Sequence, residues 1–396
     1  MNIKEKRANK IGIIAGSIML MSSLTISALL GDIAAVYPNV SRDKIQLILT
    51  IPNLIAMFCA FAAGPLTARF AKKNLLLCGM GLGLVGGFIA YFFGSMSLNI
   101  LYLSSAFIGI NQGLNGSLTK VLVPDFLEGQ ERADMMGYQA ASSTAGSVFL
   151  TLVAGVLAGI FWKNSYIVFL MFIPAMIIVK RDLKYVPPTK KSEATGEKGK
   201  LNGAVFFTAA TLFLAFLMLF TYQANVSMYI KSAGLGNVTT AGYANTIFVF
   251  AGMVAGFVFG KFRAKLDFKT MQVGIAICAL GFLGIKVFGT LLAVFCASLG
   301  AGIAQGFIIP SAMIAVSAYA PESVRATGIS ITYGLLNFGM FLSPMVLNPI
   351  ANTLVAGDLS SKFMIAGIGL LVLLVVHTAL SPVFYKKQEQ NKTQSA

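Results

Sequence analysis

The sequence predicts an all-α membrane protein with twelve transmembrane helices in two pseudo-symmetric six-helix bundles. Three observations support this fold class: the composition, the length of the apolar segments and an internal repeat. Of the 396 residues, 57% are hydrophobic and 11% are charged, whereas a soluble domain carries about 25% charged residues. The long unbroken apolar runs indicate helices, because the strands of a membrane barrel alternate apolar and polar residues.

A helix needs roughly 20 apolar residues to cross the hydrocarbon core, and twelve such stretches follow one another along the chain. They lie near residues 11–36, 45–66, 75–93, 98–122, 134–158, 164–180, 203–230, 239–260, 270–286, 289–316, 326–350 and 361–384.

An internal repeat divides these stretches into two sets of six. Residues 64–70 return at 256–262, residues 109–113 return at 302–306, and the pair Arg132-Ala133 returns as Arg325-Ala326. The offset stays at 192 or 193 residues throughout. A duplicated helical bundle is typical of secondary transporters, whose substrate site lies between the repeats. We therefore expect one bundle at 1–180 and a second at 203–396 with a short cytoplasmic tail. A polar, Pro/Gly-rich cytoplasmic linker at 181–202 joins them.

The net charge of +16 follows membrane topology and does not indicate nucleic-acid binding. If the N-terminus is cytoplasmic, 24 of the 30 Lys and Arg residues fall on the cytoplasmic side, as the positive-inside rule requires. The other six are Arg42, Lys44, Lys163, Lys231, Lys286 and Lys362. Both termini are therefore expected in the cytoplasm. The chain carries no paired carboxylates within a span, no nucleophile set and no metal cluster, so an enzyme is not expected.

The loop after the second span reads Gly64-Pro-Leu-Thr-Ala-Arg69-Phe-Ala-Lys72-Lys73. It resembles the signature loop of the major facilitator superfamily, Gly-x-Leu-Ala-Asp-Arg-x-Gly-Arg-Lys. The twelve spans, the repeated half and the central linker extend this resemblance over the whole chain. Residues 27–77 and 126–137 resemble bacterial members that export drugs and small metabolites. The loop departs from the pattern at Ala68, where the family has Asp. The fourth span departs at Gly109, where proton-driven exporters often have Arg.

The resemblance implies a secondary transporter of the bacterial plasma (inner) membrane, working by alternating access on a small organic, amphipathic molecule. Proton-coupled efflux is the first interpretation. The alternative is uptake or facilitated transport of an organic solute, including an anionic one, without a carboxylate proton relay. A remote third interpretation is a non-transporting membrane sensor. The expected partners are the substrate, the lipid bilayer and protons. A monomer without cofactor, metal or nucleic acid is expected.

The basic loop indicates a conformational latch, meaning cations that bind carbonyl ends and acidic residues of neighbouring helices in only one state. The alternative is that these charges only set the topology. The candidate latch residues are Gly64, Arg69, Lys72, Lys73, Asp125 and Asp134.

Few ionisable residues lie within the spans, where each costs several kcal/mol and is a functional candidate by default. Asp32, toward the outer end of the first span, is the candidate proton-coupling group; otherwise it is a helix-end carboxylate near water. Lys120, toward the inner end of the fourth span, either attracts an anionic group or extends to the interface. Its counterpart in the second half is Met313, so the repeat itself does not require a lysine. His377 is the only histidine, on a helix that is peripheral in this family.

Uncharged polar residues are more plentiful in the spans, and each must find a partner in lipid. They therefore either bond one helix to another or line a cavity. The repeat partners Gln112 and Gln305 favour bonding between helices, whereas the group at 222–225 favours cavity lining. The candidate substrate-binding residues are Asn111, Gln112, Asn115, Gln139, Ser143, Tyr222, Gln223, Asn225, Asn245, Gln305 and Asn337.

Overall fold

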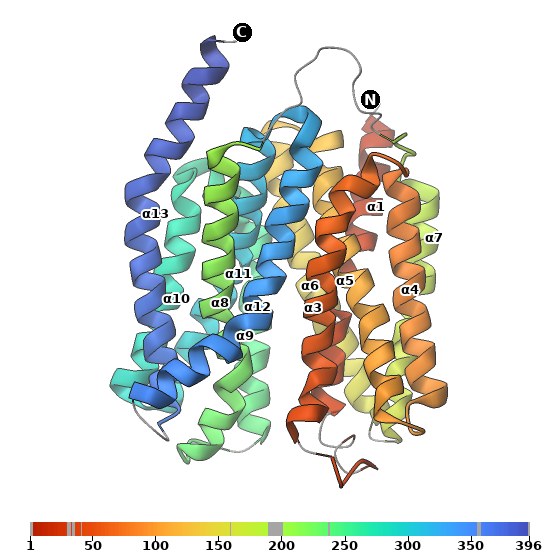
Figure 1. The fold of residues 1–396 in the computed structure, drawn as a ribbon, viewed down its shortest axis with the longest axis vertical. Coiled ribbons are helices and arrows are strands. Elements are labelled where there is room, and N and C mark those ends of the chain that lie inside the picture. Colours follow the sequence, from red (N-terminus) through yellow and green to blue (C-terminus); the bar gives the residue numbers. More distant parts are fainter. Residues whose placement is uncertain are drawn as a thin grey trace. The chain divides into compact units, whose positions relative to one another are not determined.

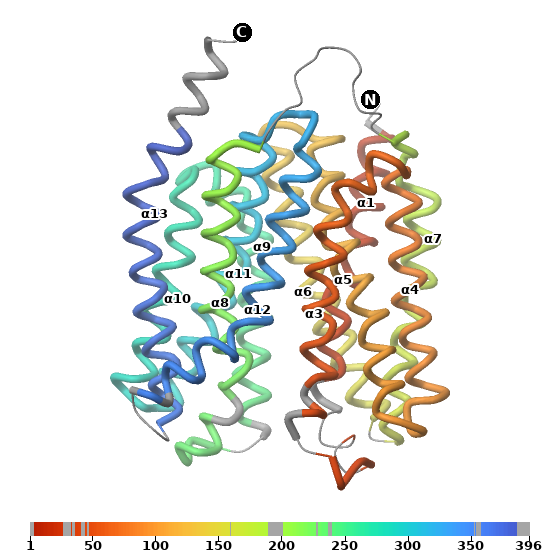
Figure 2. The backbone as a smooth tube through the Cα atoms, in the orientation of Figure 1, coloured from red at the N-terminus to blue at the C-terminus, as the bar shows by residue number. Residues whose placement is uncertain are grey.

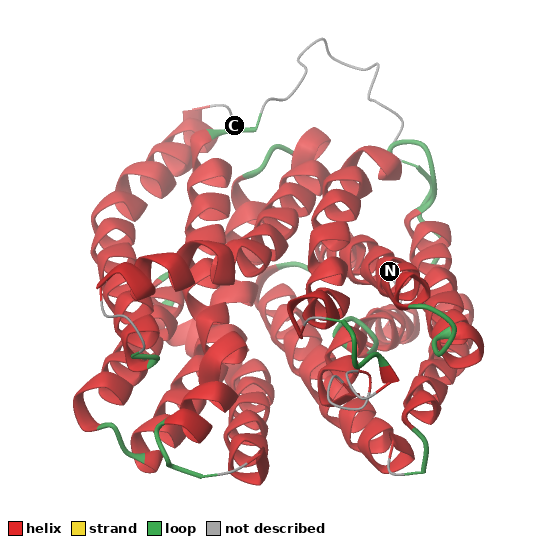
Figure 3. Cartoon of the chain, turned by 60° about the horizontal axis from the view of Figure 1, so that its bottom comes forward, coloured by secondary structure: helices red, strands yellow, loops and turns green. Residues whose placement is uncertain are grey.

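The computed structural model describes residues 3–29, 33, 36–40, 42–158, 160–188, 201–236, 238–354 and 358–394. Within these ranges the chain is helical, with short connecting loops and no strand (Figure 3). The other residues are grey in Figure 2. The elements of Figure 1 are, in chain order, α1 (Ile3–Ile18), η1 (Ser22–Leu29), α3 (Arg42–Thr67), α4 (Lys72–Phe93), α5 (Leu98–Phe126), α6 (Gly129–Ala158), η2 (Trp162–Met171), α7 (Phe172–Asp182), α8 (Gly203–Ser232), α9 (Val238–Leu266), α10 (Lys269–Phe288), α11 (Leu291–Tyr319), η3 (Glu322–Val324), α12 (Arg325–Leu354) and α13 (Ser360–Gln394).

Eleven helical segments of the described residues are long and apolar enough to cross a membrane. The twelfth predicted span is α5, which is 29 residues long and is more polar because it carries Asn111, Gln112 and Asn115. A helix of that length rises about 44 Å, well beyond a hydrocarbon core of roughly 30 Å. The predicted fold class, an all-α membrane protein with twelve spans in two six-helix bundles, is confirmed.

Two of the predicted spans are not continuous α-helices. The first span changes to the 3₁₀ segment η1 after α1 ends, and the sixth begins as the 3₁₀ segment η2 before α7. In η1 the hydroxyl of Thr25 donates to the carbonyl oxygen of Ser22 at 2.7 Å. Such local side-chain bonds compete with the α-helical ladder, so a Ser/Thr-rich stretch favours the tighter turn.

Side-chain caps fix where three of the helices begin. Ser97 accepts a hydrogen bond from a backbone amide in the first turn of α5, Asn202 does so for α8 and Thr290 for α11. Each cap satisfies one of the four amides that a helix start leaves without an internal partner.

The repeated Gly-x-x-x-Gly motif brings helix backbones into close contact in both halves. On α5, a Cβ at Gly109 would meet the carbonyl of Pro52, and a Cβ at Gly113 would overlap the backbone of Ala56, both on α3. On α11, Gly302 and Gly306 meet the backbone of α9 in the same way. Small residues are the means by which membrane helices approach closely. Helix packing therefore explains why this part of the repeat keeps its register.

The chain forms two compact units. The first contains residues 1–127, 142–198 and 329–334, and the second contains residues 128–141, 199–328 and 335–396. Three of the unit boundaries therefore fall inside α6 and α12. The predicted division into residues 1–180, 181–202 and 203–396 stays a prediction, and residues 189–200 of the linker lie outside the described residues.

We predict that Gly113→Leu destabilises the protein, because the new side chain must push α3 away from α5. Overpacking of this kind costs about 1–3 kcal/mol, which thermal unfolding in detergent measures as a lower Tm. The matched control is Gly155→Leu on α6, where nothing lies within 4 Å of an added Cβ. Equal Tm values for the two variants would contradict the close approach of α3 and α5.

Candidate functional site

The polar residues of α5 form a hydrogen-bonded row in the interior of the first unit. Gln112 donates to Asn53 Oδ1 on α3 at 2.8 Å and accepts from the Ser23 hydroxyl on η1 at 2.9 Å. The Asn111 amide donates to the carbonyl oxygen of Met19 at 3.3 Å. Asn115 donates to Asn111 Oδ1 at 2.8 Å. These amides join α5 to α3 and to the first span, as expected for Gln112.

One acceptor in this row has no partner among the described residues. The Oδ1 atom of Asn115 is buried and receives no hydrogen bond from that part of the chain, and it lies where a Cβ at Gly79 of α4 would be. A buried acceptor without a donor costs about 1–3 kcal/mol. The row therefore ends on an open acceptor between α4 and α5.

Lys120 lies on the same helix, one and a half turns further on, and is only 5% exposed. Its Nζ atom donates to the carbonyl oxygen of Gly116 at 2.7 Å and lies 4.1 Å from the ring centroid of Tyr333. The ring of Tyr333 occupies the space that a side chain at Gly116 would need. Ser117 and Ser330 share a hydrogen bond of 2.6 Å beside this contact. Within the described residues, Lys120 has no carboxylate partner.

The nearest acid further along α5 is already paired. Asp125 accepts from Lys72 of α4 at 2.6 Å, and Lys72 is only 4% exposed. Lys73 donates to the carbonyl oxygens of Lys180 and Leu183, both at 2.7 Å. Lys72 thus binds an acidic residue, and Lys73 binds carbonyl oxygens at the end of a helix. These are the two kinds of group that a latch requires.

Arg69 differs from these two lysines. Its side chain is exposed and makes no bond within the described part of the chain. Arg69 was the residue expected to bond Asp125, whereas the structure gives Asp125 the neighbouring Lys72 as its partner. The carbonyl oxygen of Gly64 accepts from the Thr67 hydroxyl at 2.6 Å. That the basic loop acts as a latch stays a prediction.

Asp134, the last candidate latch residue, lies in the second unit against α9, where that helix carries residues 256–262 of the repeat. Its Oδ1 atom accepts from Gln130 at 2.9 Å and occupies the space beside Gly260 that a Cβ would fill. Gln130 also donates to the carbonyl oxygen of Gly260 at 2.9 Å. Gly260 is the repeat counterpart of Ala68, at the position of the family's loop Asp. The acid at this place in the second copy therefore comes from α6.

The seventh-span candidates on α8 contact other helices of the second unit. The Tyr222 hydroxyl bonds to Ser298 at 2.5 Å, and its ring stacks on Phe248 and Phe282. The Asn225 amide donates to the carbonyl oxygen of Thr221 at 3.1 Å. Both residues are buried, and Gln223 beside them is partly exposed.

The remaining candidates differ in burial. Asn245 is exposed, whereas Gln139, Ser143, Gln305 and Asn337 are buried. The Nε2 atom of Gln139 has no hydrogen-bond partner in the part of the chain that the structure describes. Asp32, the proton-coupling candidate, lies outside the described residues. That these residues contact a substrate stays a prediction.

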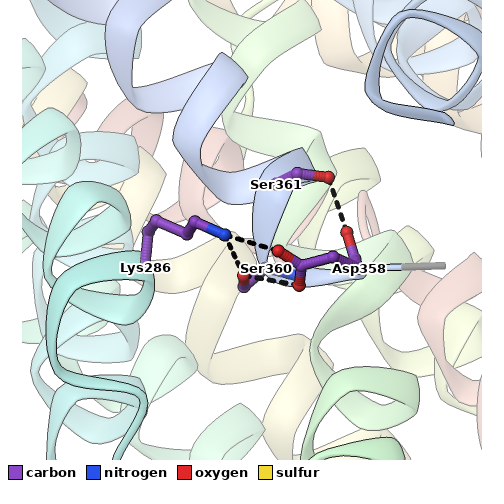
Figure 4. Close-up of polar contacts among 4 residues, drawn as sticks. All are labelled: Lys286, Asp358, Ser360 and Ser361. Atoms are coloured by element: carbon purple, nitrogen blue, oxygen red, sulfur yellow. Dashed lines mark hydrogen bonds and ion pairs between the residues drawn. The ribbon is translucent and has the colours of Figure 1, made fainter. Parts of the chain in front are cut away.

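An ion pair ties the start of α13 to the end of α10 (Figure 4). The Nζ atom of Lys286 donates to Asp358 Oδ2 at 2.5 Å and to the Ser360 hydroxyl at 3.1 Å. Hydrogen bonds from Lys286 and Ser360 hold the pKa of the Asp358 carboxyl below its usual range. In the first turn of α13, Lys362 is 7% exposed and donates to Asn225 Oδ1 at 3.0 Å. Asn225 therefore holds a buried ammonium group, a role that the sequence did not reveal.

Two apolar cavities lie away from these polar groups. One, of about 190 Å³, is lined by Leu84, Phe88 and other apolar and aromatic residues of α4 and η2. The other, of about 470 Å³, lies between α4 and α7. Neither touches the polar row of α5. They are grooves between neighbouring helices of the first unit.

The comparisons with known proteins identify the class. The chain belongs to the Major Facilitator Superfamily, whose pattern matches residues 11–344. Its fold and family are those of a membrane transporter. A curated relative, the "Putative sulfoquinovose importer" of Escherichia coli (strain K12), is 29% identical over 192 residues, which is 46% of this chain and 37% of that protein. The match thus spans well under half the length of this relative.

Solved structures show the same fold at low identity. The human organic anion transporter MFSD10 (TETRAN) superposes with a TM-score of 0.78 at 12% identity, over 93% of this chain and 99% of that one. The proton:xylose symporter XylE superposes with a TM-score of 0.74 at 14% identity, over 96% and 97%. A bacterial homologue of the iron transporter ferroportin, in an outward-facing state, superposes with a TM-score of 0.73 at 15% identity, over 96% of this chain and 100% of that one.

We predict that Asp125→Asn lowers the free energy of unfolding by about 1–3 kcal/mol, because it leaves the buried Lys72 ammonium without its counter-charge. The matched control is Glu5→Gln, which breaks the exposed pair with Lys184 at 3.8 Å; such pairs contribute about 0–1 kcal/mol. The measurement is thermal unfolding of both variants. The double variant Lys72→Met, Asp125→Leu should recover much of the loss. A shift for Asp125→Asn no larger than for Glu5→Gln would contradict the prediction.

Proposed function

We propose that the protein is a secondary transporter of a small organic anion, working by alternating access. The observation that carries this proposal is the environment of Lys120. A buried ammonium group is strongly disfavoured unless an acid or several hydrogen-bond acceptors compensate it. In the described residues, Lys120 has one carbonyl and one aromatic ring. A substrate carboxylate or sulfonate supplies the missing charge.

The fold does not require a cation at this place. Met313 stands at the repeat-related position of α11 and is fully buried. An apolar side chain of similar length therefore fits the same packing in the other half of the repeat. A lysine in its place serves a purpose other than helix packing. The neighbouring amides of α5 are neutral and leave the charge of Lys120 uncompensated.

The printed names of two similar proteins support an anionic substrate. One is an organic anion transporter, and the other is named for sulfoquinovose, a sugar that carries a sulfonate group. The structural relative shares only the fold, and the sequence relative matches only in part. They support the substrate class that Lys120 favours.

Proton-coupled efflux of an amphipathic molecule, as in bacterial drug exporters, is the second candidate function. The feature that favours it is Asp32, the carboxylate toward the outer end of the first span. The two candidates differ in what they require of Lys120. An exporter of neutral or cationic amphipathic molecules needs no buried cation, whereas an anion transporter depends on one.

We further propose a plasma-membrane (bacterial inner-membrane) protein with both termini in the cytoplasm, acting as a monomer. The 24-to-6 division of Lys and Arg residues supports this orientation. In a variant lacking the four native cysteines, Asn39→Cys should react with a membrane-impermeant maleimide in intact cells. Glu322→Cys should react only after the membrane is opened. Labelling of both positions in intact cells would refute the topology.

We predict that Lys120→Met weakens anion binding strongly while the protein still folds. The assay is the rise in Tm of purified protein with sulfoquinovose, gluconate, lactate or benzoate, against the neutral glucose and benzamide. At least one anion should raise the Tm of the native protein. Lys120→Met should weaken that binding roughly ten- to hundredfold, because a hydrogen bond to a charged group contributes about 1.5–3 kcal/mol.

Two further variants serve as controls. Lys44→Met removes an exposed cation and should leave the anion effect unchanged. Lys362→Met removes the second buried lysine that has no carboxylate partner in the described residues, and it should also keep the effect. The proposal fails if no anion acts on the native protein, if the neutral analogues act equally, or if the effect depends on Lys362 and survives in Lys120→Met.

A further inference from the structure

The surroundings of Lys120 also affect whether its side chain keeps a proton when no anion is bound. An ammonium group in a bundle interior without a counter-charge is disfavoured, and only two changes remove the penalty: an anion binds or the proton leaves. The single carbonyl of Gly116 accepts an N–H from either the ammonium or the amine. The helix therefore holds the side chain in both protonation states.

On the elements packed against Lys120, the acids of α5 and α1 are paired, and Arg325, which begins α12, adds a cation and not a counter-charge. Tyr333 is the titratable group that faces it, through its ring. On α5 and α4, Asp125 is paired with Lys72, and Lys73 is bonded to carbonyl oxygens. On α1, Glu5 pairs with the exposed Lys184. The acid of α3 is Asp43, in its first turn, whereas the backbone of α3 meets α5 further along, at Pro52 and Ala56.

We propose that Lys120 carries a proton together with the substrate anion, so that the protein cotransports one proton with each monoanion. This inference rests on the proposed function. On binding, the neutral amine of Lys120 takes up a proton from water, and the ammonium then binds the anion. On release, the anion leaves, the proton follows to water on the other side, and the neutral amine returns. For a monoanion the cycle moves no net charge.

This inference assigns to a lysine the role that a carboxylate was expected to have. The sequence places Asp32 as the only acid in a span away from the cytoplasmic ends. The structure offers a group that both holds the substrate and titrates with it. Binding of the anion and binding of the proton are then linked. Each supplies the counter-charge that the other lacks when it is buried alone.

The test is proton uptake on anion binding. Purified protein in weakly buffered detergent solution, with a pH-sensitive dye, receives sodium gluconate, lactate, benzoate or sulfoquinovose, adjusted to the same pH. The native protein should take up as much as one proton for each anion bound, with uptake increasing as the starting pH rises. Lys120→Arg should bind the same anion without proton uptake, since guanidinium does not lose its proton in proteins. Lys44→Met should behave as the native protein does.

The outcomes separate the two proposals. If no anion binds to the native protein, the proposed function itself fails. If anions bind but no proton is taken up at any pH, or if Lys120→Arg takes up protons as the native protein does, the proton inference is overturned and the anion site stands. Loss of uptake in Asp32→Asn with retention in Lys120→Arg would assign the proton to Asp32 instead.

Discussion

The structure depends on one constraint: a bundle interior in a membrane holds no water to solvate a polar group, so each such group needs a partner within the chain or in a ligand. Most buried polar groups of this protein meet that requirement. Gln112 bonds to two other elements, Lys72 to Asp125, and Lys362 to Asn225. Among the buried lysines of the described residues, Lys120 is the one whose Nζ atom meets neither a carboxylate nor a side-chain amide. This difference makes it the centre of the proposed site.

The glycine pairs of α5 and α11 determine where such groups lie. Because Gly109 and Gly113 bring α5 onto the backbone of α3, the side chain of Gln112 between them reaches Asn53. The same close approach recurs between α11 and α9 at Gly302 and Gly306. The repeat therefore preserves a packing geometry. The two copies differ at Lys120 and Met313, where the first half has a buried cation and the second half an apolar side chain.

Much of the fold could be predicted from the sequence. The long apolar runs placed the twelve spans, and the constant offset indicated two related halves. Gln112 was expected to bond helix to helix, and Lys120 was recognised as a candidate for an anionic group. Each of these inferences uses information local to one helix or one pair of repeats.

The partners of these residues could not be predicted in the same way. Tyr333 lies 213 positions from Lys120 in the chain, and nothing in either segment indicates their contact. Asn225 was assigned to a cavity, yet it receives the ammonium of Lys362. In each case the partner is set by the rotation of a helix about its own axis, which a single sequence does not determine.

We propose that an anion, and not the chain, meets the charge of Lys120, and a counter-charge built into the protein tests this. Tyr333→Glu places a carboxylate where the ring now faces the ammonium, and Tyr333→Gln is the neutral control of equal size. The measurement is the rise in Tm on adding the anion that acts on the native protein. Tyr333→Glu should lose this rise, because its own carboxylate pairs with the ammonium of Lys120, while Tyr333→Gln should retain it. An undiminished rise in Tyr333→Glu would show that the anion does not bind at Lys120.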